Sequence, residues 1–129
     1  MNNRIISMCA AGLICAGCAF TQDIDTSKLE LPALESTDYI VEYEGYISSY
    51  NVLTKTPEWV AYELTKDETY GDAIREGKFF SPDERVLLPQ PDDYDYRGSG
   101  WTRGHLAPAA DFRWSDDAMW DTFHFTNCC

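Results

Sequence analysis

Residues 102–111, Thr-Arg-Gly-His-Leu-Ala-Pro-Ala-Ala-Asp, form the stretch with the densest set of functional residue types in this sequence of 129 residues. His105 is a candidate general base, because an imidazole titrates near neutral pH. Arg103 carries a planar fork of donors that suits phosphate oxygens. The glycines Gly98, Gly100 and Gly104 allow the backbone to approach a ligand closely. This stretch is therefore where chemistry on a phosphate is expected.

The charge of the chain is strongly acidic, with 22 acidic and 10 basic residues and a formal net charge of −12. Such a balance argues against a generally basic nucleic-acid-binding surface, which needs clustered Lys and Arg to neutralise phosphates. Residues 97–113 are the exception, because they hold Arg97, Arg103 and Arg113 against a single acid, Asp111. The sequence therefore predicts a small cationic site on an acidic body.

A second block, Thr-Phe-His-Phe-Thr-Asn at residues 122–127, ends in Asn127. The two blocks together resemble the DNA/RNA non-specific endonuclease family, which includes enzymes of the endonuclease G type. The family motif is Asp-Arg-Gly-His, then Leu or Gln, Ala-Pro and a nearby Ala-Asp, and Thr102 stands where the family usually has Asp. The likeness covers roughly residues 44–129. It implies an α+β protein with the ββα-metal (His-Me finger) nuclease fold and a mixed or antiparallel sheet.

The same resemblance implies a mechanism and its residues. His105 would deprotonate the attacking water, Arg103 would orient the phosphate, and Asn127 would be the direct protein ligand of a Mg²⁺ ion. The substrates would be DNA and RNA, contacted through the backbone, while Trp101 and Thr126 would shape the strands. Whether the protein forms a homodimer is left open by the sequence. The alternative function is that of a non-catalytic lipoprotein that uses the nuclease scaffold for binding.

Family members continue beyond the position of Cys129 with Pro-Gln, a long helix and a further carboxylate. We therefore expect this sequence to be a C-terminally truncated fragment, with an incomplete fold, that is inactive and marginally stable by itself.

The N-terminus resembles a bacterial lipoprotein signal. Arg4 supplies a positive charge, Ile5 to Gly17 is uncharged, and small residues precede Cys18. We expect a signal peptide at residues 1–18, export across an inner membrane, and a lipid anchor at Cys18 in the cell envelope; ordinary secretion is the alternative. A tether would occupy residues 19–38, before the N-terminal part of the nuclease domain at 39–129.

The remaining pattern predicts few regular elements. Residues 39–50 favour a strand bent at Gly45, residues 58–64 a second strand, and residues 86–95 a loop. Phe79 and Phe80 suggest a short third strand. Ser115 is an N-cap for a short helix over residues 115–120.

Other metal sites have weaker support in the sequence. His105, His124, Cys128 and Cys129 could be considered as a zinc set, but adjacent cysteines rarely reach one tetrahedral ion together. His124 alternates with two phenylalanines and is expected on the opposite face of a strand, as a non-catalytic side chain.

Overall fold

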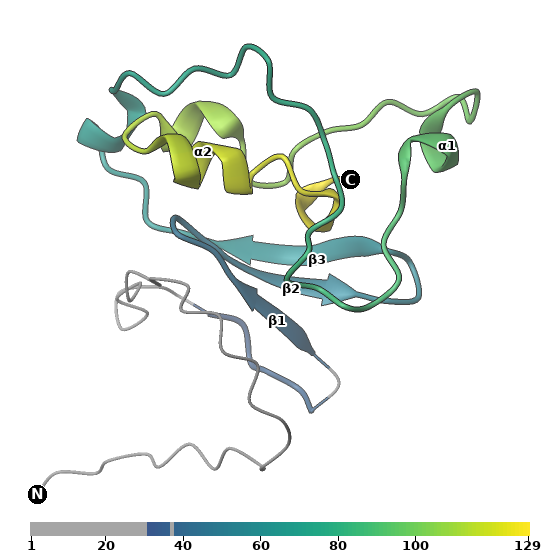
Figure 1. Ribbon diagram of the computed structural model, residues 1–129. Coiled ribbons are helices and arrows are strands. Elements are labelled where there is room, and N and C mark those ends of the chain that lie inside the picture. The colour runs from purple at the N-terminus through teal and green to yellow at the C-terminus, as the bar shows by residue number, and fades with distance from the viewer. Residues whose placement is uncertain (1–30, 37) are drawn as a thin grey trace, which may run out of the picture.

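The computed structural model describes residues 31–36 and 38–129, which form an α+β arrangement (Figure 1). The strands β1 (Tyr39–Glu42), β2 (Ile47–Asn51) and β3 (Thr56–Ala61) make an antiparallel sheet in the order of the sequence. Short helical segments follow: η2 (Asp67–Thr69), α1 (Asp93–Tyr96), η3 (Ala109–Phe112), α2 (Asp116–Asp121) and η4 (Phe125–Asn127). The predicted signal peptide, residues 1–18, lies outside the described residues. Among the helices that the structure describes, none is long and apolar enough to cross a bilayer.

Residues 39–50 form two strands joined by a tight turn, where the sequence predicted one strand with a bend. The turn is closed by the backbone N–H of Tyr43, which donates to the carbonyl of Tyr46 at 2.9 Å. A Cβ atom at Gly45 would lie 2.5 Å from Cδ1 of Phe112. Gly45 is therefore required because the turn packs directly against that ring.

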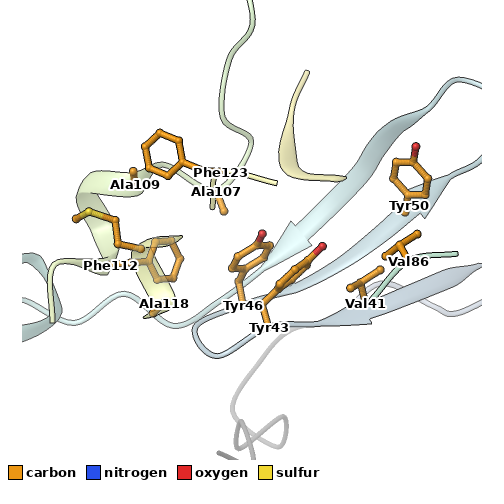
Figure 2. Packing of buried hydrophobic residues seen from close by; sticks show 11 residues of the cluster. Val41, Tyr43, Tyr46, Tyr50, Val86, Ala107, Ala109, Phe112, Ala118 and Phe123 are labelled. Atoms are coloured by element: carbon orange, nitrogen blue, oxygen red, sulfur yellow. The ribbon is translucent and has the colours of Figure 1, made fainter. Parts of the chain in front are cut away.

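The hydrophobic core lies on the face of the sheet that the helical segments cover (Figure 1). Tyr43 and Tyr46 stack with their ring centroids 4.3 Å apart, and Phe112 of η3 lies 5.7 Å from Tyr46. Figure 2 shows these rings between the strands and the C-terminal half of the chain. Burying each such side chain contributes roughly 1.5–3 kcal/mol. Packing of these aromatic residues therefore joins the hairpin to the segments that carry the predicted site.

A buried carboxylate, that of Asp83, links three parts of the chain. It accepts hydrogen bonds from the Tyr43 hydroxyl and from Nε of Arg85, both at 2.9 Å. The Arg85 guanidinium also reaches Asp121 at 2.9 Å. Burial by itself would raise the pKa of Asp83, but the hydrogen bonds and positive charge of Arg85 hold it below its usual value. This network fixes the connection after β3 against the start of the C-terminal segment.

Two short helices test the predictions from local sequence. The helix expected after Ser115 is confirmed, because the Ser115 hydroxyl accepts from the Ala118 N–H at the start of α2. The predicted loop over residues 86–95 contains α1 instead. Asp92 accepts from two backbone N–H groups there, and Asp95 accepts in return from the N–H of Asp92. The acidic run therefore forms a helix cap.

Three other predicted elements differ in extent or type. The second strand begins earlier than residue 58, since β3 covers Thr56–Ala61. Phe79 and Phe80 form no strand, and only Ser81 makes a bridge there, to His124. Residues 125–127 form a turn of 3₁₀ helix. The strand expected at His124 is reduced to the bridge with Ser81, because the chain turns into this 3₁₀ helix directly after it.

Candidate active site

His105 is held on a short backbone ladder to the C-terminal segment. Gly104 and Cys129 exchange backbone hydrogen bonds in both directions, at 2.9 and 3.0 Å, and the Leu106 N–H donates to the Asn127 carbonyl at 3.0 Å. His105 itself forms an antiparallel bridge with Cys128. Because pairing on both sides of His105 restricts its backbone, the direction of its side chain is set by the ladder.

The His105 imidazole is enclosed by aromatic rings. Its centroid lies 4.6 Å from that of Phe80 and 4.7 Å from that of Phe123, which it meets edge-on. The Nε2 atom is buried and has no hydrogen-bond partner among the described residues. Burial, and secondly the positive charge of Arg75, lower the pKa of His105 to about 4. The imidazole is therefore neutral at physiological pH, the state in which it can accept a proton.

A hollow of about 570 Å³ opens beside the rings that enclose His105. We call it the basic hollow, because four basic side chains and one acidic side chain line it together with exposed aromatic rings. Its lining consists of Arg75, Lys78, Phe79, Phe80, Asp93, Tyr96, Arg97, Trp101, Thr102, Arg103 and Phe123. His105 is not part of this lining, but it contacts Phe80 and Phe123, which are.

Arg103 lies in the basic hollow. Its guanidinium forms an ion pair with Asp93 of α1 and lies 6.0 Å from the ring centroids of Phe80 and Tyr96. The pair is substantially exposed, so that its net contribution to stability is small. An incoming phosphate therefore has to compete only with an exposed carboxylate for this arginine.

The structure adds groups to the site that sequence reasoning missed. Arg75 and Lys78 stand in an acidic part of the chain, distant in sequence from the Arg-Gly-His motif, and Phe79 was assigned to a strand. No local pattern marks them. Trp101 was expected to shape the strands, but 82% of it is exposed and it lines the hollow. Thr126, in contrast, is buried and shares a hydrogen bond with Tyr43.

Asn127 is buried and makes hydrogen bonds with the backbone around it. The residue is fully buried, its Oδ1 accepts from the Ala107 N–H at 2.8 Å, and its Nδ2 donates to the carbonyls of Ala107 at 3.0 Å and Thr122 at 2.9 Å. Both amide protons are used, and the oxygen faces backbone. Oδ1 keeps a second lone pair, so Asn127 stays a predicted Mg²⁺ ligand, and its amide also clamps the segment after His105 to the C-terminal turn.

The histidines and cysteines that were considered as a zinc set do not form a metal site. Within residues 31–36 and 38–129, no group of three or more His, Cys, Asp or Glu side chains is placed to hold a metal ion. Cys128 is buried and Cys129 is exposed, and His124 lies 3.7 Å from the Asp121 carboxylate. These His, Cys, Asp and Glu side chains therefore form no zinc site, whereas Mg²⁺ usually keeps several waters and needs few protein ligands.

Comparison with known proteins places the chain in a family. The family model for DNA/RNA non-specific endonucleases matches residues 27–129. Mitochondrial nuclease EXOG of Xenopus laevis is 39% identical over 87 residues, covering 67% of this chain and 24% of that protein. Human mitochondrial endonuclease G is 38% identical over 104 residues, covering 80% and 34%. The mitochondrial nuclease of Saccharomyces cerevisiae is 40% identical over 92 residues, covering 67% and 27%.

A solved structure supports the fold. The crystal structure of an EndoG/EndoGI complex, described as showing the mechanism of EndoG inhibition, superposes with a TM-score of 0.68 at 30% identity. The match covers 75% of this chain and 40% of that chain. The chain thus spans about a quarter to a third of the length of the curated relatives named above.

The same comparisons correct the expected location. The relatives are mitochondrial nucleases of eukaryotes, so that the prediction of a lipid-anchored protein in a bacterial envelope is wrong. Cys18, the expected anchor, lies outside the described residues. The family match, the similar relatives and the shared ββα-metal nuclease architecture agree with one another: the chain belongs to the DNA/RNA non-specific endonuclease family.

Proposed function

We propose that the protein hydrolyses phosphodiester bonds of DNA and RNA, with His105 as the general base and Mg²⁺ as the cofactor. The observation that carries this proposal is the position of His105. A backbone ladder holds it, burial and Arg75 keep it neutral, and it contacts two rings of the basic hollow. Residues 39–129 are the part of the nuclease domain that we assign to this chain.

In this proposal the residues of the chain have separate roles. His105 accepts a proton from water as the water oxygen attacks phosphorus. The bond from phosphorus to the departing 3′ oxygen then breaks. Arg103 leaves Asp93 and donates to a phosphate oxygen, where negative charge develops. Mg²⁺ supplies charge stabilisation when bound, and Asn127 would be its protein ligand. Contacts to the phosphate backbone carry no sequence information, which suits a non-specific enzyme.

The direct test uses the full-length protein, with supercoiled plasmid and transfer RNA as substrates and with Mg²⁺ or EDTA. We expect cleavage of both nucleic acids with Mg²⁺ and none with EDTA. The His105→Ala variant, examined in parallel, controls for contaminating nucleases. Binding of nucleic acid without any cleavage would contradict the enzymatic proposal and would favour the alternative of a non-catalytic binding protein.

The lowered pKa of His105 predicts an unusual pH profile. A base must be unprotonated, so kcat/KM should decline on the acidic side near pH 4 to 5 and not near the ordinary imidazole value of 6.5. The Arg75→Gln variant removes a positive charge that disfavours protonation, and its acidic limb should move to higher pH. It should stay below 6.5, because burial is the larger cause of the shift. Profiles of kcat/KM against pH for both proteins measure this. Superimposable limbs would exclude a role of Arg75 in the titration of His105.

A further inference from the structure

Two large aromatic side chains project into solvent from the basic hollow. Trp101 is 82% exposed and Phe79 is 75% exposed, and both line the hollow. A single exposed apolar side chain is common on protein surfaces. Here two exposed aromatic side chains lie beside four basic side chains, so that this surface combines flat apolar faces with positive charge.

The positive charge in the hollow is partly free to bind an anion. Lys78 is paired with Asp116, and Arg103 with Asp93. Arg75 and Arg97 form no ion pair within the residues that the structure describes, although each lies over an aromatic ring. Because the whole chain carries a net charge of −12, this local excess of positive charge is specific to the hollow. It is complementary to a polyanion.

The loop that carries Trp101 is ordered by its own hydrogen bonds. The Ser99 hydroxyl donates to the Tyr96 carbonyl at 2.8 Å, and the Trp101 N–H donates to the Ser99 hydroxyl at 3.1 Å. Gly98 and Gly100 have φ values of 74° and 89°, a region that favours glycine. The backbone is therefore preset while the indole stays uncovered, so that binding costs little ordering of the loop.

We propose that the basic hollow binds an unpaired segment of nucleic acid, with a base stacked on Trp101 and a neighbouring base on Phe79. This inference rests on the proposed function and names its substrate class. Base faces in a duplex are covered by neighbouring base pairs, whereas every base of a single strand can offer a face to an aromatic ring. Arg75, Arg97 and Arg103 bind the phosphates, in the manner of a positively charged groove that follows the backbone.

Binding experiments separate stacking from charge. The His105→Ala protein, which is not expected to cut its ligand, is titrated into fluorescein-labelled oligothymidylate of about 12 nucleotides and into a hairpin duplex of similar length. Trp101→Leu keeps an apolar side chain but removes the aromatic face, and Trp101→Phe restores a smaller one. Tyr70→Leu is the matched control, because Tyr70 is also exposed but lines a different hollow.

The expected result is a selective loss. Trp101→Leu should raise the Kd for oligothymidylate roughly 5- to 100-fold, as for the removal of one stacked base, and that for the duplex less than about twofold. Trp101→Phe should recover most of the loss, and Tyr70→Leu should change neither Kd. Equal losses on both ligands, or no loss on oligothymidylate, would overturn the inference.

If the protein with intact His105 cuts plasmid while Trp101→Leu binds normally, the inference fails and the proposed function stands. If Trp101→Leu selectively weakens binding of oligothymidylate but the protein with intact His105 cuts no plasmid, the proposed function fails and the hollow still binds single strands.

Discussion

Replacing His105 with alanine in the full-length protein is expected to lower kcat/KM for plasmid cleavage at least about 100-fold, the low end of what a general base contributes. The imidazole is neutral at pH 7, because burial and Arg75 lower its pKa to about 4, so that its unprotonated form predominates. Alanine cannot accept the proton of water. Plasmid-nicking rates of the two proteins at equal concentration, with Mg²⁺, measure the effect.

The other histidine provides the matched control. His124 is also half-buried, but its nearest charged group is Asp121 and it does not line the basic hollow. His124→Ala should retain activity within about threefold, since no part of the acid–base step depends on it. Nucleic-acid affinity of the His105→Ala protein should be nearly unchanged, because the phosphate contacts come from arginines. Nicking by His105→Ala at the rate of the unchanged protein would show that His105 is not the base.

Replacing Asn127 with leucine is expected to lower the free energy of unfolding by about 3 kcal/mol or more. Leucine is similar in size, but it leaves three buried backbone groups without partners: the N–H and carbonyl of Ala107 and the carbonyl of Thr122. Each unsatisfied buried group costs about 1–3 kcal/mol. Urea unfolding followed by tyrosine and tryptophan fluorescence gives the change.

Asn51 offers a control with the same chemistry at the surface. Its side chain donates to Glu58 and accepts from the N–H groups of Leu53 and Thr54, but water can replace these partners in an exposed loop. Asn51→Leu should therefore cost less than about 1 kcal/mol. Equal destabilisation by the two substitutions would contradict the role of Asn127 as a buried clamp.

Asn127→Asp separates the clamp from a metal ligand. Aspartate keeps an oxygen that would suit Mg²⁺, but it cannot donate to the carbonyls of Ala107 and Thr122. The clamp predicts a large loss of stability, together with a loss of activity that follows the folded fraction. A stable variant with Mg²⁺-dependent cleavage intact would contradict the clamp and would support Asn127 as a ligand.

Several elements could be predicted from local sequence, because the forces that form them act over a few residues. Ser115 caps α2 through the backbone N–H of Ala118, three residues away. The strand-forming residues after Tyr39 form β1 and β2, although the sequence did not distinguish a bend at Gly45 from a turn between two strands. That distinction depended on Phe112, whose ring leaves no room for a Cβ atom at Gly45.

The sequence alone determined the family and the candidate base. The motif around His105 and the block ending in Asn127 are continuous stretches, and a continuous stretch carries its identity without any knowledge of the fold. They also predict Arg103 as a phosphate-orienting residue, and its side chain lies in the basic hollow.

Only the tertiary structure decided the environment of these residues. Arg75, Lys78 and Phe79 come to the Arg-Gly-His motif through folding of a long connection, which no spacing rule encodes. The pKa of His105 depends on burial, and so it exists only once Phe80 and Phe123 enclose the ring. Asn127 is a predicted ligand by its place in a motif, and only the fold shows that its amide also binds three backbone groups. Residue identity is local, whereas burial, charge and saturation of hydrogen bonds are properties of the neighbours that folding brings together.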